Sequence, residues 1–412
     1  MSKLRIGKSY WLDQYKGRAP RFAPMHGADV ADVAIVGGGF TGCLAACLFA
    51  DAGLRVVLLE GQRIGRGSTA ASTALLMHEP DVAFGDLAAR YGVRHARRIW
   101  MRSRASVRGL TRLLQRLRIG AALQSVPSVH WACDTTTSGD MRRELARRRG
   151  AGIGGRWLSP AALNHETGID GAGGILVRGN ALIDPYRACL GLAVHARAAG
   201  ARLHEHSSAR RVIGDRHSVR IELDRGELRA NWAVIATGYA TPDFKPLAGR
   251  FHMSNTYVIA TPQIGAKTRR EMGLGDLMLW DTNRPYHYAR WTPDRRLLFG
   301  GGDEPKLPPA ARRDTLDRHA ARLMANLVAL YPALDGTSPE YAWDGLFATT
   351  PDGLPYIGPH RRYPRQLFAL GYGGNGMTFG SLAAQMLLRA IQGRPAEDDR
   401  LFGFGRRRTE NC

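Results

Sequence analysis

Six residues near the N-terminus, Gly37–Gly42, have the spacing G-x-G-x-x-G, and their chemistry suits a bound pyrophosphate. Gly37 permits a tight turn, Gly39 has no Cβ to keep a phosphate away, and Gly42 lets the next helix pack closely. Backbone N–H groups and the helix dipole favour negative phosphates there. Glu60 follows Gly42 by 18 residues, where it can accept hydrogen bonds from ribose hydroxyls and would repel a 2′-phosphate. We therefore expect a dinucleotide other than NADP.

The residues around this pattern predict a strand–helix–strand unit. Asp32–Val36 is a short apolar run, small residues then continue as a helix to Ala52, and Arg55–Leu59 is a second apolar run that ends at Glu60. Glycine-rich loops also occur without a ligand, but here the strands, the helix and the acidic residue follow in the required order. The sequence therefore predicts a βαβ dinucleotide-binding unit.

Hydrophobic periodicity predicts further elements. Apolar residues recur every three or four positions over 93–117, which predicts an amphipathic helix with its arginines in solvent. Asp184 and Pro185 are residue types preferred at a helix N-cap and first position. Residues 251–303 hold several strand-like runs and predict an antiparallel sheet in a second domain. Further helices are expected at 138–149, 311–330 and 378–392, and further strands at 125–133, 201–205, 219–224 and 232–237.

Length and composition predict a two-domain globular protein without a membrane span. The chain has 412 residues, 44% of them hydrophobic, and no apolar run reaches the ~20 residues that cross a bilayer. The N-terminus is basic but has no apolar stretch typical of a secretion signal. The five cysteines show no CxxC or metal-ligand spacing, so we expect no bound metal. Their odd number, without a secretion signal, predicts a reducing, cytoplasmic location.

The formal net charge of +22 can indicate a nucleic-acid partner. However, only six of the 58 basic residues are lysines, and codon bias explains such an arginine excess more easily than a binding surface does. The arginines also spread along the chain, apart from 90–118 and 142–149. We therefore do not expect a nucleic-acid partner.

Four motifs together resemble FAD-dependent oxidoreductases of the D-amino-acid oxidase, sarcosine oxidase and glycine oxidase superfamily. The resemblance runs from Ser9-Tyr10 to the last expected helix, and amine-oxidising members such as gamma-glutamylputrescine oxidases are the most similar. The motifs are VGGGFTG (36–42) with Glu60, GSTAASTA (67–74), AVIATG (233–238), and WDGLFATTPDGLPYIG (343–358) with GYGGNGMT (371–378).

This resemblance implies an α/β fold with a discontinuous, Rossmann-like FAD-binding domain and an α+β substrate domain whose antiparallel sheet roofs the flavin. We expect the FAD-binding domain at 1–78, 165–245 and 340–405, the substrate domain at 79–164 and 246–339, and a tail at 406–412. N–H groups of the last glycine-rich loop would face the flavin pyrimidine edge and stabilise its reduced form. The expected FAD contacts are Gly37, Gly39, Phe40, Thr41, Gly42, Glu60, Gly67, Ser68, Ser72, Thr73, Val212, Ala236, Thr237, Gly238, Gly373, Gly374, Asn375, Gly376, Met377 and Thr378.

Several positions depart from the relatives. Some relatives attach flavin to a His in a GSTWHAAGL-like segment, where this chain has Ala71, and sarcosine oxidases use a Cys in a region that reads 345–348 here, without Cys. We therefore expect non-covalent FAD. Phe347 stands where amino-acid-oxidising relatives often carry an Arg for the substrate carboxylate. An amine, or an N-substituted amino acid held by another arginine, is therefore expected rather than a simple D-amino acid.

The candidate catalytic residues are Tyr257, Tyr288, Arg290 and His78. Alternation places Tyr286, Tyr288 and Arg290 on one face of an expected strand. Arg290 could bind a carboxylate, or be a surface or salt-bridged arginine. Tyr257 could equally be a core aromatic, and His78 could belong to an ordinary loop.

The resemblance implies oxidation of a C–N bond. A hydride equivalent would pass to flavin N5 as the amine becomes an imine, which water hydrolyses, and oxygen or an electron carrier would reoxidise the flavin. The oligomeric state stays open. Two alternatives also stay open: a tRNA-modifying FAD enzyme of the same fold, suggested by the charge, and a non-catalytic FAD-binding subunit of a hetero-oligomeric oxidase.

Overall fold

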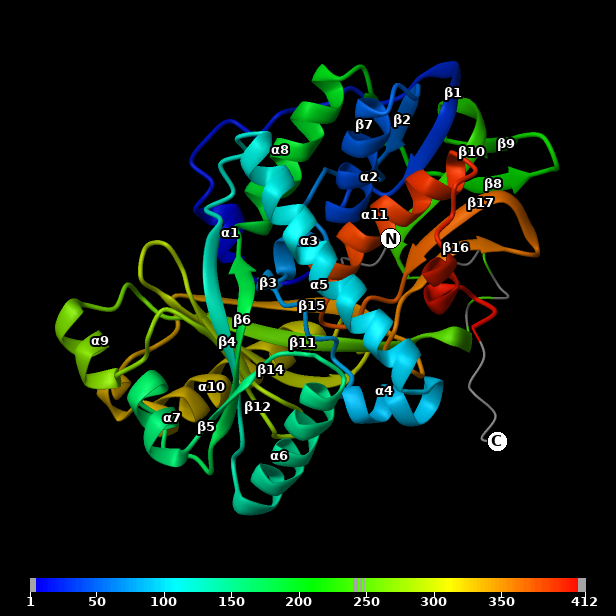
Figure 1. Ribbon diagram of the computed structural model, residues 1–412. Coiled ribbons are helices and arrows are strands. Elements are labelled where there is room, and N and C mark those ends of the chain that lie inside the picture. The colour runs from blue at the N-terminus through cyan, green and yellow to red at the C-terminus, as the bar shows by residue number, and fades with distance from the viewer. Residues whose placement is uncertain (1–4, 240–243, 245–246, 248, 407–412) are drawn as a thin grey trace.

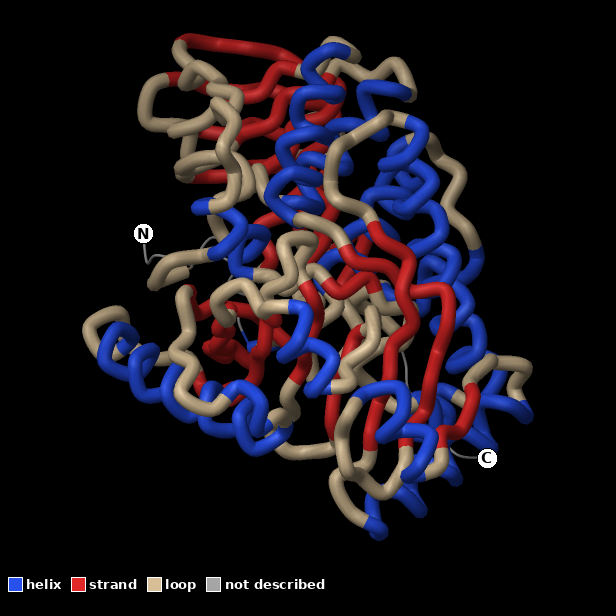
Figure 2. Tube along the Cα trace, turned by 90° about the vertical axis from the view of Figure 1, so that its left-hand side faces the viewer, coloured by secondary structure: helices blue, strands red, loops and turns tan. Residues whose placement is uncertain are grey.

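The chain folds around two β-sheets, each with its own covering helices (Figure 1). The computed structural model describes residues 5–239, 244, 247 and 249–406. Figure 2 shows the strands in two groups, one at the top of the molecule and one in its lower half.

The first sheet contains the dinucleotide motif, and its strands lie in the order β16-β17-β10-β1-β2-β7. β1 is central and pairs in parallel with β2 and β10, so the carboxyl ends of these strands meet at one edge. Ligands of open α/β sheets bind at such an edge. β8 and β9 extend the sheet from β10 by antiparallel pairing. The strands are β1 (Gly27–Val36), β2 (Val56–Leu59), β7 (Arg202–His204), β8 (Arg211–Gly214), β9 (Val219–Glu222), β10 (Gly226–Gly238), β16 (Tyr356–His360) and β17 (Tyr363–Leu370).

Helices α2, α8 and α11 pack on the first sheet, and α5 packs on α11 (Figure 1). The predicted cap of α8 is confirmed, because the Asp184 side chain accepts a hydrogen bond from the Arg187 N–H at 2.9 Å and Pro185 is the first helical residue. The predicted long amphipathic helix is α5, and Ser106 within it donates to the Thr378 carbonyl of α11 at 2.7 Å. The helices are α2 (Phe40–Asp51), α5 (Val93–Arg116), α8 (Pro185–Ala198) and α11 (Gly376–Ile391), with the short α1 (Tyr10–Asp13), α3 (Ser68–Ala71) and η3 (Glu397–Phe402) nearby.

The second sheet has the order β15-β11-β14-β13-β12-β4-β6-β3, and β5 also pairs with β6. Its pairs are antiparallel as predicted, except that β12 and β4 are parallel. We call it the roof sheet. Its strands are β3 (Leu75–Leu76), β4 (Gln124–Trp131), β5 (Arg156–Leu158), β6 (Gly174–Leu182), β11 (His252–Ala260), β12 (Met278–Asp281), β13 (Tyr288–Trp291), β14 (Leu297–Pro305) and β15 (Tyr341–Thr349). Around it lie α4 (Phe84–Tyr91), α6 (Thr135–Gly150), α7 (Pro160–Thr167), α9 (Ala266–Met272), α10 (Arg312–Leu330) and η2 (Pro332–Leu334).

The two faces of the roof sheet have different partners. On β11, Tyr257 and Ile259 belong to a core shared with α10, whereas Val258 belongs to the core shared with the first domain. Because side chains alternate along a strand, each roof strand presents every second residue to the first domain.

Three strands of the roof sheet lie within segments that the sequence prediction assigned to the FAD-binding domain. They are β3 (within 1–78), β6 (within 165–245) and β15 (within 340–405), and they pair with β6, β4 and β11 respectively. Parts of the predicted segments and tail, at 1–4, 240–243, 245–246, 248 and 407–412, lie outside the described residues. Among the residues that are described, no helix is long and apolar enough to cross a membrane.

Candidate functional site

The backbone from the end of β1 into the first turn of α2 has no room for a side chain at Gly37 or at Gly42. Gly37 has φ +111°, and a Cβ there would lie 2.6 Å from the Ala236 carbonyl oxygen of the neighbouring strand. A Cβ on Gly42 would lie 1.9 Å from the Gly37 carbonyl oxygen. These contacts give the first and last glycines the roles in turn geometry and close helix packing that the sequence predicted.

The start of α2 stays close to a second part of the predicted site. Gly39 is the N-cap, and the N–H of Phe40 donates to Thr69 Oγ1 at 2.9 Å. The neighbouring Thr41 is buried against α11, where a Cβ on Gly380 would lie 2.5 Å from Thr41 Oγ1. The N-terminus of α2, the segment 67–74 and α11 therefore meet at one place.

Glu60 follows the end of β2, beside this turn. Its Oε2 accepts the Gly38 N–H at 2.7 Å and its Oε1 accepts the Gln62 N–H at 2.8 Å. Burial raises the pKa of the Glu60 carboxyl, and these two backbone N–H groups oppose that rise. Each carboxylate oxygen can accept a further hydrogen bond, as a ribose would require.

Side chains from distant parts of the chain fix residues 67–74, which we call the cofactor segment. Its carbonyl oxygens accept hydrogen bonds from tryptophan, serine and arginine side chains, and Ser68 Oγ donates to the Leu346 carbonyl at 3.1 Å. The donors are Ser9 to Ala70 (2.6 Å), Trp11 to Ser72 (2.8 Å), Trp343 to Ala71 (2.9 Å) and Arg290 to Thr73 (3.0 Å). A segment held in this way can follow an extended cofactor without rearranging.

The glycine loop, residues 371–377, leads from the end of β17 into the start of α11 and lies beside the end of β10. The Gly371 N–H donates to the Gly238 carbonyl at 2.9 Å, and Thr378 Oγ1 donates to the Met77 carbonyl at 2.8 Å. Gly238 has φ +81°. The predicted contact residues on β10 and α11 thus come together, and Val212 packs in the same apolar cluster as Val36 at the end of β1.

Asp81 was not among the predicted site residues, yet it contacts the glycine loop. Its Oδ2 accepts the Gly374 N–H at 2.6 Å, and its Oδ1 accepts Asn375 Nδ2 at 2.9 Å. Asp81 is an exposed residue, and the desolvation of its carboxyl by the groups around it raises its pKa to about 6. The loop N–H that was expected to face the flavin therefore has a carboxylate beside it.

Tyr286, two residues before β13, lies against the same loop, and Tyr288 at the start of β13 lies beside Tyr286. A Cβ on Gly374 would lie 3.0 Å from Tyr286 Oη, and the Tyr286 and Tyr288 rings have centroids 5.9 Å apart. Tyr288 Oη lies 3.2 Å from Thr256 Oγ1, and the nearby Asp303 has a buried Oδ1 without a hydrogen-bond partner among the described residues. Burial raises the pKa values of both phenols and of the Asp303 carboxyl. We call Asp81, Thr256, Tyr286, Tyr288 and Asp303 the roof cluster.

Arg290 is neither a surface residue nor a salt-bridged one. It is 2% exposed, and its Nη1 donates to the carbonyls of Thr73 (3.0 Å), Ala74 (3.4 Å) and Ile183 (2.8 Å). Burial lowers its pKa to about 10. The structure corrects the hypothesis of a carboxylate-binding Arg290, because its guanidinium already holds the cofactor segment.

Tyr257 lies on the opposite face of the roof sheet from the cofactor segment. Its ring stacks on His319 of α10 with centroids 3.8 Å apart, and its hydroxyl donates to Glu304. It is fully buried in the α10 core. The catalytic hypothesis for Tyr257 is therefore replaced by its alternative, a core aromatic.

His78 follows the cofactor segment and is buried against β6. Its Nε2 lies 3.1 Å from the Arg178 carbonyl, and its N–H donates to Asn180 Oδ1 at 3.0 Å. Burial lowers the pKa of His78, so its ring is neutral at neutral pH. The adjacent Glu79 forms a buried ion pair with Arg148 at 2.8 Å.

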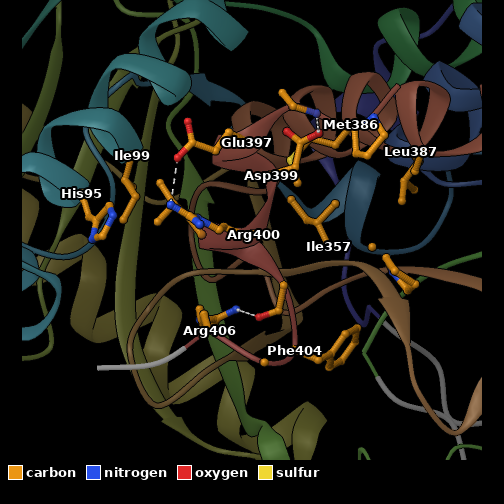
Figure 3. A pocket seen from close by; sticks show the side chains of 18 of the residues that line it. His95, Ile99, Ile357, Met386, Leu387, Glu397, Asp399, Arg400, Phe404 and Arg406 are labelled. Carbon is orange, nitrogen blue, oxygen red and sulfur yellow. Dashed lines mark hydrogen bonds and ion pairs between the residues drawn. The ribbon is translucent and has the colours of Figure 1, made fainter. Parts of the chain in front are cut away.

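A separate pocket of about 790 Å³ lies at the far end of α11 (Figure 3). Ile99, Ile357 and Met386 form its apolar wall, and Arg400 and Glu397 are paired at its edge. Because Met386 is ten residues after the start of α11, this pocket is distinct from the glycine loop.

The arrangement defines a two-domain dinucleotide-binding protein whose residues fit FAD. Four features surround the carboxyl edge of the first sheet: the turn at residues 37–42, which we call the glycine turn, Glu60, the cofactor segment and the glycine loop. The backbone of the glycine turn can pack this closely because Gly37 and Gly42 have no Cβ. The comparisons with known proteins agree with this class.

The chain belongs to the FAD dependent oxidoreductase family, which matches residues 32–390. It is 23% identical over 405 residues to a probable oxidoreductase OrdL of Haemophilus influenzae, covering 96% of this chain and 90% of that protein. It is 25% identical over 391 residues to the gamma-glutamylputrescine oxidoreductase of Escherichia coli, covering 92% and 88%. The fold matches the crystal structure of glycine oxidase from Geobacillus kaustophilus with a TM-score of 0.76 and 21% identity over 93% of this chain and 99% of that one.

The predicted family, fold class and FAD cofactor are thereby confirmed, and the chain is an oxidoreductase. The individual contact residues stay predictions. The sequence analysis missed Asp81, Thr256 and Asp303, and only the position of Asp81 just after the cofactor segment could have drawn attention to it.

We predict that Gly42→Ala yields protein with less than about a tenth of the normal FAD, because the new Cβ would lie 1.9 Å from the Gly37 carbonyl and displace the phosphate-binding turn. The measurement is visible flavin absorbance per purified chain. Gly120→Ala is the matched control, since a Cβ there meets nothing within 4 Å. Equal flavin content in the two variants would contradict the role of this turn.

Proposed function

We propose that this protein oxidises the C–N bond of an amine that it recognises without a carboxylate-binding arginine. The observation that carries the proposal is the face of β15 that meets the cofactor segment. Trp343 and Gly345 on this face contact Ala71, and alternation puts Phe347 on it too. Phe347 offers no charge where amino-acid-oxidising relatives often have an arginine, and Arg290 is already bound to carbonyl groups.

The glycine turn, Glu60, the cofactor segment and the glycine loop would hold FAD, which would supply an acceptor for a hydride equivalent from the carbon next to the amine nitrogen. The protein side chains hold that carbon in place and keep water away while the amine becomes an imine. Water then hydrolyses the imine to a carbonyl compound and an amine. No strong protein base is required for this chemistry.

The roof cluster supports a substrate that carries a positive charge. The cluster contains the carboxyl groups of Asp81 and Asp303. It also contains the hydroxyls of Tyr286 and Tyr288, which stay protonated because their pKa values are raised. We propose that the Asp81 carboxylate holds an ammonium group remote from the reacting nitrogen. Protonated phenols can donate to or accept from the rest of the substrate.

Anaerobic bleaching of the flavin absorbance tests the proposed function. The holoprotein is mixed with primary amines, diamines, N-methyl amino acids, D-amino acids and proline analogues, and we expect only amines without a carboxylate next to the nitrogen to bleach it. Bleaching by simple D-amino acids would contradict the argument from Phe347. If no compound bleaches a bound flavin, the RNA-modifying or subunit alternative replaces this proposal.

We predict that Asp81→Asn raises the KM for a diamine at pH 8 by about tenfold to a hundredfold, because a hydrogen bond to a charged group contributes about 1.5–3 kcal/mol. A monoamine of equal length is the control substrate and should change little. The exposed Asp86 gives the matched control variant Asp86→Asn.

The same variant has an expected pH dependence. The pKa of Asp81 is raised to about 6, so its carboxylate is charged above that pH and neutral below it. The ratio of kcat/KM for the diamine between the normal protein and Asp81→Asn should therefore rise with pH through about 6 and then stay constant. A ratio that does not vary between pH 5 and pH 8 would contradict the proposed ammonium contact.

We predict that FAD leaves the protein completely on acid denaturation, because Ala71 and residues 345–348 offer no His or Cys for a covalent bond. The measurement is the flavin fluorescence of the supernatant against that of the precipitate. Flavin retained by the precipitate would show an attachment that the resemblance did not anticipate.

A further inference from the structure

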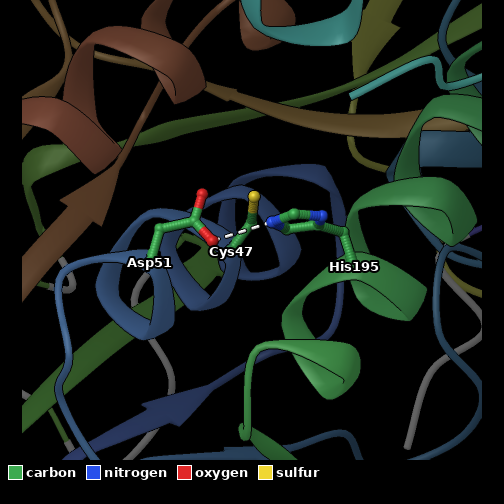
Figure 4. Close-up of side chains that lie close together, drawn as sticks. All are labelled: Cys47, Asp51 and His195. Carbon is green, nitrogen blue, oxygen red and sulfur yellow. Dashed lines mark hydrogen bonds and ion pairs between the residues drawn. The ribbon is translucent and has the colours of Figure 1, made fainter. Parts of the chain in front are cut away.

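A thiol, an imidazole and a carboxylate meet between α2 and α8, away from the glycine turn (Figure 4). Cys47 and Asp51 are four residues apart on α2 and therefore share one face of the helix. His195 comes from α8, and its Nε2 lies 2.7 Å from Asp51 Oδ1. One ligand atom from each of the three residues lies within 4.8 Å of the other two.

This set of donor atoms suits zinc. Zinc binds thiolate, imidazole and carboxylate ligands in tetrahedral sites, and three protein ligands leave one position for water. A Cys47 thiolate and an Asp51 carboxylate would together balance the two charges of the ion. The Asp51 and His195 side chains are each 31% exposed, whereas Cys47 is buried, so an ion could enter from solvent.

The helix ends favour a cation at this place. Asp51 is the last residue of α2, and His195 lies in the last turn of α8. The carbonyl end of a helix is its negative end, so a carboxylate there is unfavourable unless a positive charge lies beside it. Both helices therefore contribute negative potential at the three ligand atoms.

Cys47 also differs from the other two buried cysteines of α2 and α8. The Cys43 and Cys189 thiols both donate to the Gly38 carbonyl, at 3.5 and 3.8 Å. Among the hydrogen bonds of the described residues, none involves the Cys47 thiol, although it points toward the Asp51–His195 pair in Figure 4. Burial raises the pKa of Cys47 to about 12, and a bound metal ion would displace the thiol proton.

We propose that Cys47, Asp51 and His195 bind one zinc ion that joins α2 to α8. The spacing of residues along the chain did not predict it, because His195 is 144 residues from Asp51 and only the packing of the two helices brings them together. The ion would fix the C-terminal end of the helix whose N-terminal end forms the phosphate turn. This site is independent of the proposed amine substrate.

The test is zinc binding by the FAD-loaded full chain after treatment with a chelator. We expect one zinc per chain by elemental analysis, and a zinc X-ray absorption spectrum with one sulfur ligand at about 2.3 Å and the remaining ligands nitrogen or oxygen. The readout does not depend on enzyme activity. FAD content per chain shows that each preparation is folded.

The ligand variants are Cys47→Ala, Asp51→Asn and His195→Gln. Each should weaken zinc binding by more than about tenfold, because even residues that only support a metal ligand cost 10–100-fold when lost. Matched controls are Cys133→Ala, a half-buried thiol, and His165→Gln, a histidine in the last turn of α7, which should bind zinc normally. The two half-exposed variants, Asp51→Asn and His195→Gln, keep the test valid if Cys47→Ala does not fold.

Three results would overturn the proposal: no stoichiometric zinc, a spectrum without sulfur, or zinc binding that all three ligand variants retain. In any of these cases the Asp51–His195 contact would be an ordinary ion pair between two helix ends.

Discussion

The buried guanidinium of Arg290 is the contact on which the relation between the two domains depends. It extends from β13 of the roof sheet and donates to the carbonyls of Thr73, Ala74 and Ile183. Thr73 and Ala74 end the cofactor segment, and Ile183 precedes the capped start of α8. A buried charge is costly unless hydrogen bonds satisfy it, and four carbonyl oxygens do so here, because Nε also donates to the Trp291 carbonyl at 3.1 Å. One side chain therefore fixes the roof, the cofactor segment and a helix of the first domain.

A second buried arginine fixes the chain a few residues later. Arg148 pairs with Glu79 and with Glu144, each at 2.8 Å, and Glu144 accepts the backbone N–H groups of Phe84 and Gly85. The residues between these two points carry Asp81. Because both ends of this stretch are held by hydrogen-bonded charges, Asp81 reaches the glycine loop without depending on the conformation of a free loop. The geometry of the predicted site thus rests on two arginines that do not enter it.

Local patterns predicted the cofactor side of the site, since its elements follow one another along the chain. The glycine turn, α2, β2 and Glu60 are consecutive, and the cap of α8 is readable from Asp184 and Pro185 alone. The roof was harder to predict, because alternation shows which residues share a face but not which face meets the cofactor. The sequence therefore left the face of Tyr257 open, and the structure places its side chain in the α10 core, whereas Arg290 reaches the cofactor segment. Asp81 and Gly374 are 293 residues apart, and no periodicity connects them.

The charge of the whole chain and the charge of the site have opposite signs. The net charge is +22, yet the roof cluster contributes two carboxyl groups and no basic side chain. Many arginines lie at the surface in pairs such as Arg210–Asp224, where both partners are exposed. Screening limits such surface charges to about 8 Å at physiological salt. A substrate between the domains would therefore respond mainly to Asp81 and Asp303, and the arginine-rich surface would not prevent the binding of a cation there.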